Sequence, residues 1–121
     1  MTQLDLILET YVHATSESVA GAVSEPGFAR ELWPLWSVVV SEDRGPLGVR
    51  WLLDDARYSG STEVWVEAVA SDACVLHTFV RVDRRGGSVS AWRRRRVRDR
   101  MVKTLWRFKD DVEGRVAHSG G

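Results

Sequence analysis

The sequence has a single cysteine, Cys74, among its 121 residues. One thiol cannot form an internal disulfide, so nothing in the sequence requires an oxidising compartment. The three histidines lie far apart along the chain and show no metal-ligand spacing such as HExxH. We therefore expect neither a bound metal ion nor a cofactor.

Long hydrophobic runs are also missing. No apolar run approaches the ~18 residues that span a bilayer. The first residues include Asp5 and Glu9 in place of a basic segment followed by an apolar core, so they do not form a signal peptide. These absences predict a cytoplasmic protein. The sequence also lacks a glycine-rich phosphate loop, a GxSxG motif and a Cys–His nucleophile arrangement, so no common motif assigns a reaction.

The formal net charge is zero, but the charges are unevenly distributed. Residues 1–80 hold 4 basic and 12 acidic side chains, whereas residues 81–121 hold 13 basic and 5 acidic ones. Such polarity can steer partners or favour self-association. Alternatively, a basic C-terminal element packs beside an acidic sheet within one molecule.

The first two thirds of the chain show strand-like patterns with two short helices. Residues 4–14 alternate between apolar and other side chains, and a period of two is typical of a strand with two distinct faces. Thr15 or Ser16 can cap a short helix, and a second helix is expected over residues 28–32. Further strands are predicted over residues 38–41, 49–56, 62–69 and 75–83, with a break at residues 58–60.

The last third predicts one long helix over residues 92–116, where the only glycine is Gly114 and proline is absent. A core-facing stripe recurs at three- and four-residue spacing; its members are Val97, Met101, Leu105, Phe108 and Val112. A long helix must bury such a stripe, and the sheet is its only large partner. The chain therefore predicts a single α+β domain over residues 1–117, in the order β–α–α–β–β–β–β–α, and a disordered tail over residues 118–121.

Three stretches carry a resemblance to a known family. Residues 12–19 combine a strand end, a small residue and a glutamate before an apolar helix. Residues 32–36 read LWPLW, a tryptophan-rich segment after the second helix. Residues 63–67 and 75–83 form a hairpin, which the basic helix containing residues 103–106 follows.

Over nearly its whole length the chain resembles the START/SRPBCC superfamily, which includes polyketide cyclase-like and Bet v 1-like proteins, and in particular uncharacterised actinobacterial members. The resemblance implies a helix-grip fold, in which a curved antiparallel sheet of five to seven strands packs on a long C-terminal helix. It also implies that a lipid- or polyketide-like apolar molecule binds between sheet and helix. Some relatives are cyclases or dehydratases, and others only bind, sense or carry.

Aromatic walls suit flat apolar ligands, and six tryptophans are many for this length. The residues expected to line the cavity are Trp36, Trp51, Trp65, Phe79, Met101 and Leu105.

The hairpin over residues 62–83 has two self-consistent faces. If Ala70 pairs with Cys74, one face places Glu63 opposite Arg81, Trp65 opposite Phe79, and Glu67 opposite His77. If this face turns inward, Glu67 and His77 form an acid–base pair suited to a cyclase- or dehydratase-type lyase. If it turns outward, Trp65 and Phe79 form an exposed patch that could be a dimer contact. The sequence leaves both orientations open.

The opposite side of the long helix is basic, and Arg93, Arg95, Arg96 and Arg100 form its predicted basic surface. This surface is either the solvated outer face of a core helix or a contact for an acidic partner, and contact with an anionic membrane stays open. A homodimer is a candidate partner, and no nucleic acid is expected. The leading hypothesis is a binding protein for an apolar small molecule; the alternatives are an enzyme that uses His77 with Glu67 and an interaction module acting through the basic helix.

Overall fold

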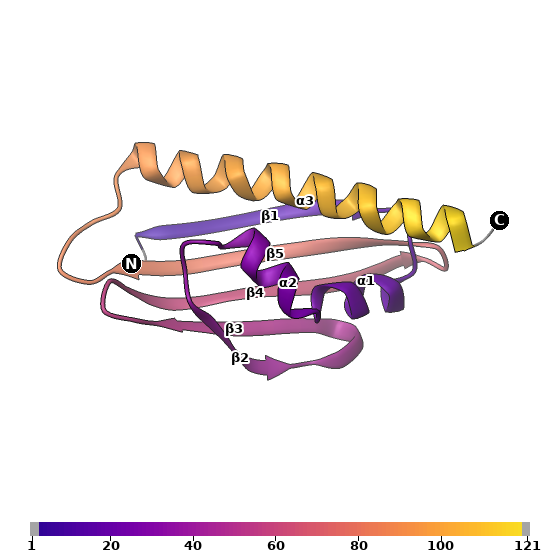
Figure 1. Ribbon diagram of the computed structural model, residues 1–121, viewed down its shortest axis with the longest axis horizontal. Helices are drawn as coiled ribbons and strands as arrows, with labels where there is room; N and C mark the ends of the chain where they lie inside the picture. The colour runs from indigo at the N-terminus through magenta and orange to yellow at the C-terminus, as the bar shows by residue number, and fades with distance from the viewer. Residues whose placement is uncertain (1–2, 120–121) are drawn as a thin grey trace.

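The computed structural model describes residues 3–119, which form one antiparallel sheet and three α-helices (Figure 1). The elements follow in the order β1 (Leu4–Val12), α1 (Ser16–Val23), α2 (Pro26–Leu32), β2 (Val38–Asp43), the 3₁₀ turn η1 (Gly45–Leu47), β3 (Gly48–Asp54), β4 (Tyr58–Ala70), β5 (Ala73–Arg84) and α3 (Ala91–Ser119). The strands lie side by side as β1-β5-β4-β3-β2. The predicted α+β class, element order and long C-terminal helix are confirmed. The tail is predicted over residues 118–121, but α3 extends through residues 118 and 119, and residues 120–121 lie outside the described residues.

All three helices share one buried core with one face of the sheet (Figure 1). Alternate residues of β1, such as Leu4, Leu6 and Leu8, point into this core. The residues between them belong to the opposite face, which no described helix covers; we call it the open face. Its members on the five strands include Ile7, Glu9, Tyr11, Glu42, Arg50, Leu52, Ser61, Glu63, Trp65, Glu67, His77, Phe79 and Arg81.

The predicted break at residues 58–60 is wrong, because β4 already begins at Tyr58. The turn lies just before it, where Asp55 Oδ1 accepts hydrogen bonds from the backbone N–H groups of Arg57 at 2.8 Å and Tyr58 at 2.7 Å. The hydrogen bond from Tyr58, and then that from Arg57, lowers the pKa of the Asp55 carboxyl. Gly60 is part of the strand at φ 151°, and an added Cβ would lie 2.0 Å from the carbonyl oxygen of Arg81. The glycine therefore serves close backbone approach within the sheet, and it does not end the strand.

The β4–β5 hairpin has a register two residues away from the predicted one. Glu63 lies opposite Phe79 and Trp65 opposite His77, and the register shifts between Ala68 and Ala70. Two residues separate Ala70 from its partner Ala73, where pairing with Cys74 would leave three. The irregularity between Ala68 and Ala70 shifts the register by one further residue. Because a shift by two preserves the period-two alternation, every side chain stays on its predicted face.

Candidate functional site

The two halves of α3 differ in burial. Among residues 91–100 only Val97 is partly buried, whereas Met101, Leu105 and Val112 are between 1% and 3% exposed. Four residues before Val97, the stripe falls on Arg93, whose charge cannot enter an apolar core. Val97 is therefore the first residue of the apolar stripe, and the turn of α3 before it has no apolar residue in the stripe. In Figure 1, α3 lies farther from β1 at its beginning than along its second half.

A cleft of ≈ 230 Å³ lies beneath the first half of α3, at the end of the sheet where β1 and β4 begin. Its lining comes from the sheet (Leu4 and Tyr58), from the segment after α2 (Leu35 and Trp36), from the loop before α3 (Val89) and from α3 itself (Trp92, Arg93, Arg96, Val97 and Arg100). The Trp36 and Tyr58 rings lie 5.9 Å apart. Leu35 and Trp92 are 82% and 65% exposed. The cleft is therefore largely apolar inside, with exposed apolar side chains on its border.

Three arginines surround this cleft because their three- and four-residue spacing puts them on the same side of the helix as Val97. Arg93 Nη1 donates a hydrogen bond to Tyr58 Oη at 2.9 Å. The Arg96 guanidinium lies 5.1 Å from the centre of the Trp92 ring. Within residues 3–119, none of Arg93, Arg96 and Arg100 forms an ion pair with an acidic side chain. The cleft therefore presents uncompensated positive charge to any molecule that enters it.

No protein-family model and no curated protein matches the chain. Solved structures do match. A START superfamily protein from Mycobacterium smegmatis has a TM-score of 0.65 and 12% identity, over 94% of this chain and 97% of that one. The solution structure of the Aha1 dimer from Colwellia psychrerythraea has a TM-score of 0.65 and 10% identity, over 90% of this chain and 96% of that one. Norcoclaurine synthase from Thalictrum flavum, in complex with dopamine and hydroxybenzaldehyde, has a TM-score of 0.52 and 13% identity, over 94% and 86%.

The chain has the helix-grip fold of the START superfamily. Identities of this size show the fold and assign no ligand or reaction. Placement of the chain in an actinobacterial branch stays a prediction.

The predicted cavity of this helix-grip domain is partly filled by its own side chains. Trp51, Met101 and Leu105 are at most 4% exposed. The Trp51 ring packs against Phe28, with centroids 6.1 Å apart, and against Trp33, with centroids 5.3 Å apart. Aromatic rings from α2 and its following segment therefore pack against Trp51. A void lined jointly by Trp51, Met101 and Leu105 stays a prediction.

Trp36 is the predicted cavity residue that does line the cleft. It also borders a neighbouring hollow of ≈ 530 Å³ between the α1–α2 junction and β2, which includes Trp51. One tryptophan thus separates two hollows on the helix-covered side of the sheet.

Trp65 and Phe79 lie on the open face, away from the cleft. The Trp65 and His77 rings stack with centroids 4.8 Å apart, and His77 stacks on Phe79 at 6.5 Å. His77 Nε2 lies 3.0 Å from Glu67 Oε1, and Nδ1 lies 3.8 Å from Glu9 Oε1. The Glu67–His77 pair therefore forms, but on the side of the sheet opposite to α3. The orientation in which this face lines the cavity beneath the long helix is wrong.

Several cleft residues are not predicted by any sequence pattern. Tyr58 falls in the predicted break at residues 58–60, although Asp55 three residues earlier is compatible with an Asx-type turn that ends at Tyr58. Leu35 lies in the segment after α2, outside any regular element, and Trp92 is the second residue of α3, before the apolar stripe of that helix. Within the described residues, no group of His, Cys, Asp or Glu side chains could hold a metal ion, and no helix is long and apolar enough to cross a membrane.

Proposed function

We propose that the protein binds a compact apolar molecule that carries one negatively charged group, in the cleft beneath the first half of α3. The observation that carries this proposal is the combination of an apolar cleft with three arginines, none of which has an acidic partner among the described residues. A carboxylate or phosphate would receive charge-assisted hydrogen bonds from these guanidinium groups, and the apolar body would contact Leu4, Trp36 and Val97.

The size of the cleft limits the ligand. Typical small-molecule pockets measure about 300–1,000 Å³, and the cleft of ≈ 230 Å³ lies below this range. A medium-chain fatty acid or a one- or two-ring carboxylic acid is therefore a better candidate than a sterol or a long polyketide. This retains the lipid- or polyketide-like ligand class and adds the acidic group.

The charge requirement can be tested with decanoate and its neutral analogue decanol, following tryptophan fluorescence. Wild-type protein should bind decanoate saturably and more tightly than decanol. The double variant Arg96→Gln/Arg100→Gln should bind decanoate about tenfold or more weakly, since hydrogen bonds to charged groups contribute about 1.5–3 kcal/mol and 1.4 kcal/mol is a factor of ten. Arg95→Gln is the matched control, because Arg95 is exposed on the same helix and does not line the cleft.

The location of the site is tested by filling the cleft. Val97→Trp adds a large ring beside Trp36 at a partly buried position, so it should abolish decanoate binding while the far-ultraviolet circular dichroism stays that of wild type. An equal loss of affinity in Arg95→Gln and in the double variant would contradict a specific role of the cleft arginines. Saturable decanoate binding in Val97→Trp equal to that of wild type would place the site elsewhere.

Two sequence hypotheses stay predictions. A cyclase or dehydratase would need an acid–base pair in the cleft, and Glu67 and His77 lie on the open face. Homodimer formation, which sedimentation velocity would measure directly, is tested below together with the open face.

A further inference from the structure

The open face contains a hollow that the proposed function does not use. Its volume is ≈ 470 Å³, and it lies on the side of the sheet opposite to α3. Its lining includes Arg44, Arg50 and Arg81 as well as Glu63, with Ser61 between them. The lining of the hollow thus holds three arginines and one glutamate. Around it the open face is acidic, with Asp5, Glu9 and Glu67 on neighbouring positions.

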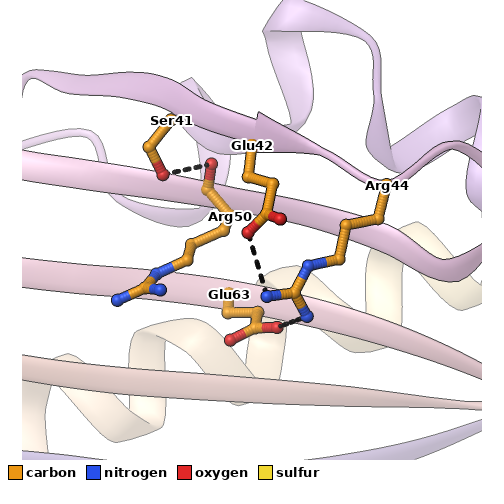
Figure 2. Close-up of polar contacts among 5 residues, drawn as sticks. All are labelled: Ser41, Glu42, Arg44, Arg50 and Glu63. Carbon is orange, nitrogen blue, oxygen red and sulfur yellow. Dashed lines mark hydrogen bonds and ion pairs between the residues drawn. The ribbon is translucent and has the colours of Figure 1, made fainter.

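Arg44 forms ion pairs with two carboxylates, Glu63 in the lining of the hollow and Glu42 beside it. Arg44 Nη1 lies 2.5 Å from Glu63 Oε1, and Arg44 Nη2 lies 3.0 Å from Glu42 Oε2 (Figure 2). The hydrogen bond to Glu42, followed by the charge of Glu63, raises the pKa of Arg44 above its ordinary value. The Glu63 carboxylate is therefore paired with Arg44 and not with Arg50 or Arg81.

Arg50 and Arg81 have no acidic partner among residues 3–119. The contact drawn to Arg50 in Figure 2 is a hydrogen bond of 3.2 Å from Ser41 to the Arg50 backbone carbonyl. No hydrogen bond or ion pair joins the Arg50 guanidinium to the other residues drawn. Asp5 is the register partner of Arg81 on β1, but the two form no ion pair. The guanidinium groups of Arg50 and Arg81 are therefore available to bind a ligand.

The sheet register brings these two arginines toward one point. Arg50 on β3 lies opposite Glu63 on β4, and Arg81 on β5 lies opposite Ser61 on β4. Since neighbouring strands are about 4.8 Å apart, β3 and β5 flank β4 at about 10 Å from each other. The two guanidinium groups can reach an anion above Ser61 from opposite sides, and the Ser61 hydroxyl can donate to it.

An aromatic surface adjoins this point. Phe79 precedes Arg81 by two residues on the same face of β5, and its ring continues the stack of His77 and Trp65. Phe79 is partly buried and Trp65 is 39% exposed, so both offer ring area to a ligand. A planar ring lying on Phe79 would place a carboxylate attached to it over Ser61.

We propose that this hollow is a second binding site, specific for a small aromatic carboxylate. Arg50 and Arg81 hold the carboxylate and Phe79 and Trp65 contact the ring. Neither the cleft beneath α3 nor its arginines take part, so this site stands or fails separately from the proposed function.

The experiment uses 2-naphthoate, with the neutral 2-naphthol as its matched probe, and follows the tryptophan indole N–H signals by NMR. Trp65→Phe assigns the Trp65 signal. In the wild-type protein 2-naphthoate should shift the Trp65 signal saturably, and 2-naphthol should shift it at least tenfold more weakly. Arg50→Gln/Arg81→Gln should weaken the naphthoate effect by tenfold or more. Arg57→Gln, an exposed arginine outside the hollow, should leave it unchanged.

The variants also separate this site from the cleft. Arg96→Gln/Arg100→Gln should leave the naphthoate shift of Trp65 as it is in wild type. The proposal is overturned if wild type shows no saturable Trp65 shift, if naphthol binds as well as naphthoate, or if Arg50→Gln/Arg81→Gln binds like wild type. It is also overturned if the protein sediments as a dimer that Trp65→Glu converts to a monomer, because a second copy would then cover this face.

Discussion

Two valines on α3 provide a direct test of the cleft, because they carry the same side chain in different surroundings. Val97 is partly buried and borders the cleft, whereas Val112 is 3% exposed and belongs to the core. Truncation of each to alanine removes the same two methyl groups from the same helix. Any difference in the free energy of unfolding therefore reports how tightly each half of α3 is packed.

The magnitudes follow from burial. Two fully buried methyl groups contribute about 1.6 kcal/mol, and an unfilled cavity adds about 1 kcal/mol. Alanine is the better helix former by about 0.5 kcal/mol. Val112→Ala should therefore lower the free energy of unfolding by about 2 kcal/mol. At Val97 about half the transfer free energy applies and the cleft already exists, so the net loss should be about 0.3 kcal/mol.

Urea unfolding followed by far-ultraviolet circular dichroism measures both values, provided that the m-values of the two variants agree. For a domain of this size, the corresponding Tm decreases are about 8 °C for Val112→Ala and about 1 °C for Val97→Ala. If Val97→Ala is destabilised as much as Val112→Ala, the first half of α3 is packed against the sheet. The cleft would then be filled in solution, and the binding proposal that depends on it would fail.

Three further predictions concern the fold. Thr78 is fully buried and its hydroxyl has no hydrogen-bond partner among the described residues, so Thr78→Val should raise the free energy of unfolding in urea by about 1 kcal/mol; a loss of about 1 kcal/mol would mean that the hydroxyl is paired. Gly60→Ala should lower the free energy of unfolding by about 3 kcal/mol or more, because φ is positive and the new Cβ would meet the Arg81 carbonyl oxygen. A urea midpoint equal to that of wild type would refute this. The hydrogen bond from Lys109 lowers the pKa of Glu113 below its ordinary 4.5, so Glu113 stabilises the fold above that pH and loses this effect as pH falls. Glu113→Gln should be about 0.5 kcal/mol less stable than wild type at pH 7 and equal to it near pH 2; a constant difference would contradict the assignment.

Local patterns predicted the elements well. The alternation along β1 and the spacing of Met101, Leu105 and Val112 on α3 both describe single elements, whose faces are set by backbone geometry. The hairpin register was wrong by two residues, yet the faces of Trp65 and His77 were right. The reason is that facing depends on parity along a strand, whereas register depends on the length of the loop and on the irregularity beside it.

The sequence by itself determined which residues share a face and that one long helix ends the chain. The prediction that the basic side chains of this helix all lie opposite its apolar stripe is wrong, because Arg93, Arg96 and Arg100 line the cleft together with Val97. Only the tertiary structure decided which face of the sheet is covered. Both faces of the β4–β5 hairpin carry apolar residues, Val64 and Val66 on one and Trp65 and Phe79 on the other, so composition alone does not choose between them.

The positions of the hollows, too, were decided by the tertiary structure alone. Trp51 fills the core because the rings of Phe28 and Trp33 pack against it, and the cleft opens because the stripe of α3 begins only at Val97 beside Trp36. A hollow is the volume left over when segments distant in the sequence have packed together. No periodicity within one segment records that volume, and for this reason the binding surfaces of this protein appear only in the folded chain.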